Sequence, residues 1–134
     1  MEFNFALIFG IFIAIDIVIA VLVFYFYGKK GFSEKDKEFF RKKWQEAASL
    51  PDQRLTVLEA DKLLDKLLHK KGYAGSLGEK LKKAGTLFSD INAVWSAHKL
   101  RNRFAHELDF KPSPQEMGSA IRSFEKAFRD LQIL

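Results

Sequence analysis

The stretch HKLRNRFAHELDFKPSPQE, residues 98–116, holds the end of one predicted helix, a turn, and the start of another. Ser113, Pro114 and Glu116 form a capping-box pattern with Pro at the first helical position, which predicts a last helix running to the C-terminus. Its apolar residues recur at helical spacing: Met117, Ala120, Ile121, Phe124, Phe128 and Leu131. The segment before the turn is unusual, because an Arg, an Asn and two His stand where an apolar stripe should run.

The helix before this turn is expected from about Leu87 to Glu107. When it is wound at about 100° per residue, its polar residues share one narrow strip. That strip contains Asn92, Ser96, Lys99, Arg103 and Glu107. The remaining circumference is apolar and contains Ile91, Val94, Trp95, Ala97, Leu100, Phe104 and Ala105. We therefore expect this helix to be buried on most of its sides.

Four polar residues interrupt the apolar arc: His98, Arg101, Asn102 and, at its border, His106. A guanidinium without a partner in a protein interior costs several kcal/mol of desolvation, so Arg101 needs a carboxylate, a phosphate or water beside it. By helix-face reasoning, the nearest candidate carboxylates are Asp61 and Asp65 on the flank of an earlier helix. Arg101 is thus expected either in a structural ion pair or in a solvated cleft.

The rest of the chain after residue 28 also has a helical pattern. Ser33 is a candidate N-cap, Pro51 and Asp52 separate two helices, and Ser76 is a candidate cap for a short one. The second of these helices carries the apolar stripe Val57, Ala60, Leu64, Leu67 and Leu68, and ends at Lys70-Lys71-Gly72. The fold class is therefore all-α, with an antiparallel four-to-five-helix bundle over residues 29–134. Its core is small, so a homodimer is expected.

Residues 1–28 are different in kind. The run from Phe5 to Tyr27 has 23 residues with one charge, Asp16, and as a helix it would span roughly 35 Å. It starts without a basic region and ends in aromatic residues, unlike a cleaved secretory signal. It is predicted to be a single uncleaved transmembrane anchor in the lipid bilayer, with Asp16 near mid-depth as a functional candidate.

The charge distribution orients this anchor. Glu2 precedes it, whereas Lys29 and Lys30 follow it at once, which predicts the N-terminus outside and the C-terminal domain in the cytoplasm. All 22 Lys and Arg and 15 of the 17 acids follow the anchor, giving that part a formal charge of +7. An excess of this size suits an anionic partner, either a lipid surface or nucleic acid.

The segment LRNRFAHE, Leu100–Glu107, resembles the signature of the HEPN superfamily: an Arg, a polar residue, and a His near the end of a bundle helix. The likeness covers residues 33–134 and extends to small bacterial proteins anchored by one N-terminal helix. It implies metal-independent RNA cleavage by a dimer in the catalytic members. Arg101 would stabilise charge on the phosphate, His106 would act as general acid or base, and Asn102 would orient one of them.

Two functions stay open at this point. One is RNA binding, with or without endoribonuclease activity; the other is a non-catalytic interaction or scaffold module with a protein partner and a structural Arg-His network. In either case the supporting residues are His98, Asp61 and Asp65. His98 is expected to be a core histidine whose hydrogen bonds are made within the protein. With three His and no Cys, no metal site and no cofactor is expected.

Overall fold

The structure is a computed structural model and describes residues 4–28 and 31–134. Every regular element in this part of the chain is helical, and no strand occurs there. The elements are α1 (Phe5–Gly28), α2 (Glu34–Ala48), α3 (Gln53–Lys70), α4 (Leu77–Ala84), the 3-10 helix η1 (Gly85–Leu87), α5 (Ile91–His106) and α6 (Pro114–Asp130). They divide into two compact units, Met1–Gly31 and Phe32–Leu134.

The first unit consists of α1. Its segment Phe5–Tyr25 is long and apolar enough to cross a membrane, judged by length and composition, and none of it is buried within the protein. Asp16 is exposed on this helix. Lys29 and Lys30, which the sequence places at the membrane surface, lie outside the described residues.

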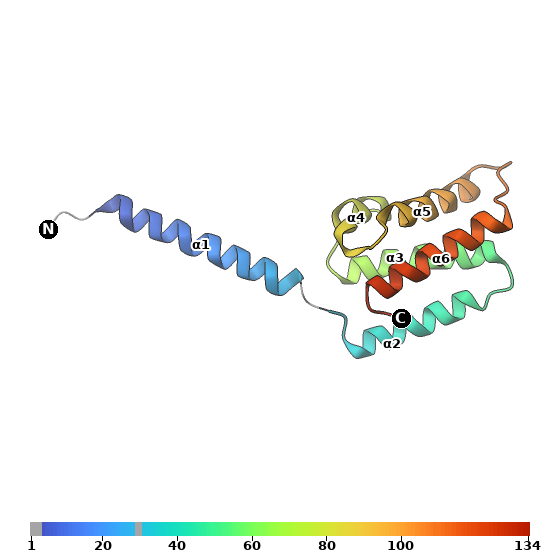
Figure 1. The fold of residues 1–134 in the computed structure, drawn as a ribbon, viewed down its shortest axis with the longest axis horizontal. Helices are drawn as coiled ribbons and strands as arrows, with labels where there is room; N and C mark the ends of the chain where they lie inside the picture. Colours follow the sequence, from blue (N-terminus) through green and yellow to red (C-terminus); the bar gives the residue numbers. More distant parts are fainter. Residues whose placement is uncertain (1–3, 29–30) are drawn as a thin grey trace. The chain divides into compact units, whose positions relative to one another are not determined.

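In the second unit, α3 is the central helix. It packs against α2, α4, α5 and α6 (Figure 1). α3 and α6 lie side by side, with α2 on one side of them and α4 and α5 on the other. The last residues return beside α2, where Arg41 Nε donates to the backbone oxygen of the buried residue Ile133 at 3.1 Å.

The apolar stripe predicted for α3 forms the centre of the core. All five of its residues are fully buried, and they pack in one cluster with Phe124 and Phe128 of α6. Each such Leu or Phe contributes roughly 1.5–3 kcal/mol through removal of apolar surface from water. Met117 and Ile121, predicted on the same stripe of α6, are only half-buried: Ile121 lies at the edge of the stripe, and Met117 lies in the first turn of the helix.

The helix ends follow the predicted capping chemistry. Ser33 caps α2, Ser76 and Glu79 form a capping box on α4, and Ser113 with Glu116 forms another on α6. α3 ends at Lys70, and Gly72 follows its C-cap Lys71 with a φ of +103°, which suits a residue without a side chain. There the amide of Tyr73 donates to the Leu68 carbonyl and the amide of Gly72 to the His69 carbonyl, so the last turn of α3 is satisfied.

Two expectations about the helix preceding the turn are wrong. It begins at Ile91 and not near Leu87, because Asp90 accepts from the amide of Ala93 and caps it, while the preceding residues form η1. Nor is α5 buried on most sides, since only Val94 and Ala97 are fully buried. The helix packs on α6, α3 and α4 and leaves its remaining surface exposed.

The aromatic residues of α2 are divided between core and surface. Phe40 and Trp44 are buried as their spacing predicts, and Trp44 meets Phe128 edge-on at 5.0 Å between ring centroids. Phe39, in contrast, is 54% exposed. It precedes Phe40 by one residue, and neighbours on a helix point about 100° apart.

Candidate functional site

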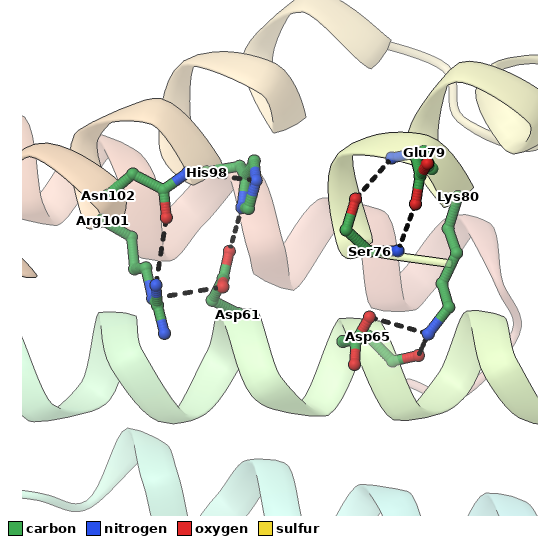
Figure 2. A network of polar contacts seen from close by, with 8 residues as sticks. All are labelled: Asp61, Asp65, Ser76, Glu79, Lys80, His98, Arg101 and Asn102. Carbon is green, nitrogen blue, oxygen red and sulfur yellow. Dashed lines mark hydrogen bonds and ion pairs between the residues drawn. The ribbon is translucent and has the colours of Figure 1, made fainter. Parts of the chain in front are cut away.

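Four polar side chains meet between α3 and α5. Asp61 comes from α3, and His98, Arg101 and Asn102 come from one turn of α5. Residues three and four apart lie on neighbouring parts of a helix surface, so the His98, Arg101 and Asn102 side chains can converge on one carboxylate. Figure 2 shows this convergence above α3. We call these four residues the Asp61 cluster.

The contacts in the Asp61 cluster form a closed ring. Asp61 Oδ1 lies 2.7 Å from His98 Nδ1, and Asp61 Oδ2 lies 3.3 Å from Arg101 Nε. Arg101 Nη1 donates to Asn102 Oδ1 at 3.0 Å. Asn102 Nδ2 lies 3.3 Å from His98 Nε2, which joins the two halves of the ring.

The hydrogen bonds of this ring run in one direction. A guanidinium only donates, so Asn102 turns its oxygen toward Arg101 and its amino group toward His98. His98 Nε2 then accepts, and Nδ1 carries the proton donated to Asp61. Both nitrogens of the His98 ring are therefore engaged, and neither is free for acid-base work on a substrate.

Burial makes the cluster energetically important. The exposed fractions of the side chains are 6% for Asp61, 12% for His98 and 23% for Arg101. A carboxylate removed from water costs several kcal/mol unless cations and donors surround it. Arg101 Nε is itself buried and makes no aligned hydrogen bond, so its attraction to Asp61 is that of an ion pair. Arg101 is thus held against α3.

Asp65, the other predicted partner of Arg101, belongs to a separate contact. Its Oδ1 accepts from Lys80 Nζ at 2.8 Å, and its backbone oxygen lies 3.3 Å from the same nitrogen. Here the cation is the buried member: Lys80 is 5% exposed and Asp65 is 42% exposed. Sequence reasoning missed Lys80. The available signal was its place in the first turn of α4, next to the capping residue Glu79.

His106 does not join the Asp61 cluster. It is exposed at the last position of α5, and no hydrogen bond or ion pair joins its ring to another described residue. Five residues of helix turn the chain by about 140° relative to the starting position. Arg101 and His106 of one chain therefore project from different sides of α5.

Other predicted features lie elsewhere. Asp16 is on α1, and in the described part of the chain no three His, Asp or Glu side chains are grouped as metal ligands would be. Comparison with known proteins finds no match to this chain, whether among family models, curated proteins or solved structures. Its function has to be inferred from its own geometry.

Proposed function

We propose that this chain is a membrane-anchored, non-catalytic interaction module with an antiparallel helical bundle of the HEPN-like type. The observation that carries this proposal is the pairing of Arg101 with the buried carboxylate of Asp61 inside a closed ring. Every member of that ring is occupied by another member. A network of this kind fixes the register of α5 on α3, which is a structural role.

The separation of Arg101 from His106 supports the same proposal. A catalytic pair needs its acid-base group and its cation on the same reacting phosphate, with contacts of about 3 Å. Within one chain these side chains project about 140° apart around α5. Arg101 is moreover engaged by Asp61 and Asn102.

The proposed anchor is α1. Its length and apolar composition suit a bilayer, and the step from Glu2 to Lys29 and Lys30 favours a cytoplasmic second unit with the N-terminus outside. A reporter domain that works only in the cytoplasm should be active when it is fused after Leu134. Activity of a periplasmic or extracellular reporter would contradict this orientation.

The decisive test of the module is an RNA assay with the full chain in detergent. The chain is incubated with mixed RNA and EDTA, and we expect the RNA to remain intact. Cleavage in EDTA by the unmutated chain, lost on His106→Ala, would overturn the non-catalytic assignment. Lys126→Ala, an exposed change on α6, serves as the control for preparation and contaminating nuclease.

One observation favours a second function, a metal-independent endoribonuclease acting as a dimer. The imidazole of His106 is exposed and unengaged among the described residues, so it is available to act as a general acid or base. A second copy would have to supply the Arg101 that meets it. In that case cleavage should fall by a factor of at least about 100 in both Arg101→Ala and His106→Ala, and active protein should sediment as a dimer.

A further inference from the structure

The outer side of α5 carries a stripe of four residues, of which only Asn102 belongs to the Asp61 cluster. Trp95, Lys99, Asn102 and His106 follow one another at intervals of four, three and four residues. At about 100° per residue these positions fall within roughly 60° of one another around the helix. Trp95 and Asn102 are half-buried there, whereas Lys99 and His106 are exposed.

A hollow of about 510 Å³ opens at the N-terminal half of this stripe, between α4 and α5. Its lining consists of Lys82, Asn92, Trp95, Ser96 and Lys99. None of these residues is acidic. Among the described residues neither Lys82 nor Lys99 forms an ion pair. The Glu79 carboxylate accepts from the amide of Ser76 at 2.7 Å, which lowers its pKa, and Lys82 helps to lower that pKa from longer range.

Trp95 lines this hollow, and its ring has three neighbours. The His98 ring meets it in an edge-type contact at 6.1 Å between centroids, and Gly78 lies so close to one edge of the indole that a Cβ there would touch it. Lys99 Nζ lies over the indole at 5.9 Å from the centroid. A cation over an aromatic face occupies the position that a flat, electron-poor ring can take by stacking.

We propose that this hollow binds single-stranded nucleic acid, with a base stacked on Trp95 and phosphates held by Lys82 and Lys99. The inference names the partner of the proposed module and rests on its cytoplasmic placement. Asn92 and Ser96 add an amide and a hydroxyl at the base edge. An aromatic platform between cations is the arrangement that single strands need, whereas a lipid headgroup uses the cations and leaves the ring face unused.

Fluorescence can isolate Trp95, because the chain has only two Trp and the other, Trp44, is buried. In a Trp44→Phe background, full-length chain in zwitterionic micelles is titrated with a ten-nucleotide single-stranded oligouridylate in EDTA. Stacking should quench the emission. Anisotropy of the labelled oligonucleotide, measured with the unmutated chain, gives the same affinity without relying on that background.

Three substitutions test the assigned roles. Trp95→Leu keeps the apolar packing but removes the π face, and should weaken binding by about 5- to 150-fold. Lys82→Gln and Lys99→Gln should each weaken binding and lower the slope of log affinity against log salt by about 0.7, the value for one phosphate of a single strand. Lys126→Gln, an exposed change on α6, should leave both the affinity and the slope unchanged.

The opposite outcomes would overturn the proposal. One such outcome is an equal loss of oligonucleotide affinity in Lys126→Gln and Lys82→Gln, and another is an affinity that Trp95→Leu leaves unchanged. A third is displacement of the oligonucleotide by anionic vesicles whose total phosphate concentration is lower than that of the oligonucleotide. Inorganic pyrophosphate binding as tightly as the oligonucleotide would mean a phosphate site without a stacked base. If the chain cleaves RNA, the non-catalytic assignment fails, and the hollow is then tested by binding in His106→Ala.

Discussion

The Asp61 cluster and the Asp65–Lys80 pair stand one turn apart on α3, yet they are built in opposite ways (Figure 2). In the cluster the acid is buried and its cation Arg101 reaches toward solvent. In the pair the cation is buried and the acid is partly exposed. Each joins α3 to a helix of the same layer, the cluster to α5 and the pair to α4.

The difference teaches which substitution is costly. A buried charge left without its partner keeps the full desolvation cost, whereas an exposed charge left behind is solvated by water. The cost of breaking each contact should therefore depend on which member remains. The following predictions use that asymmetry, beginning with the largest expected effect.

Arg101→Ala should be the most damaging of these changes. It leaves the Asp61 carboxylate buried with His98 alone, at a cost of about 3 kcal/mol, the lower end for a broken buried pair. For a unit of this size the melting temperature should drop by more than about 10 °C. Thermal unfolding followed by circular dichroism measures it. Arg122→Ala, exposed on α6, is the control, and near-native melting of Arg101→Ala would place Arg101 in a solvated cleft instead.

In the Asp65–Lys80 pair, removing the acid should destabilise the protein more than removing the cation. Asp65→Asn leaves the buried ammonium of Lys80 with a backbone oxygen and a neutral amide, and should cost about 2 kcal/mol. Lys80→Met removes the buried charge and keeps the apolar stem, so the loss should stay below about 1 kcal/mol. Denaturant unfolding of both variants gives the two values. A larger loss of unfolding free energy for Lys80→Met than for Asp65→Asn would contradict the proposed difference between the two contacts.

Asn102→Ala opens the ring without removing a charge. The expected loss is about 1 kcal/mol, the net value of an ordinary hydrogen bond, because Asp61 keeps both His98 and Arg101. Nitrogen NMR of the His98 ring should still show the proton on Nδ1. A proton that moves to Nε2 in this variant would contradict the assigned direction of the ring.

The ion pair between Asp36 and Lys70 should contribute least to stability among these contacts. Its nitrogen and oxygen are 2.9 Å apart, and the Lys70 ammonium holds the pKa of Asp36 below its ordinary value of 3.8. A depressed pKa contributes stability that is complete above the ordinary value and is lost as the pH falls through the lower one. Lys70→Ala should raise the Asp36 pKa in an NMR titration while thermal stability at pH 7 hardly changes, and Lys35→Ala should leave that pKa unaltered.

Much of the helical order could be predicted because its signals are local. Ser33, Ser76 and Ser113 are caps in the structure as in the sequence, and the stripe of α3 is buried throughout. A cap needs only its own first turn, and a stripe needs only the period of the helix. These features do not depend on which helix packs against which.

The candidate site depended on packing and was predicted only in part. Helix-face reasoning reduced the candidate partners of Arg101 to Asp61 and Asp65 but did not choose between them. In the structure Arg101 pairs with Asp61, and Asp65 pairs with Lys80 of α4. The apolar arc of α5 suggested burial on most sides, while Trp95 and Leu100 are only half-buried. An amphipathic pattern gives the orientation of a helix but not how many neighbours cover it.

The thin cover of α5 also has a consequence for its motions. α3 contributes eight buried residues, whereas α5 contributes Val94 and Ala97 and is otherwise attached by half-buried apolar residues and by the Asp61 cluster. Local opening costs least where few buried contacts are lost, so amide protons of α5 should exchange with solvent through partial unfolding while those of α3 exchange only when the whole unit unfolds. A ligand on the outer side of α5 would then reveal itself by slowing exchange along this one helix.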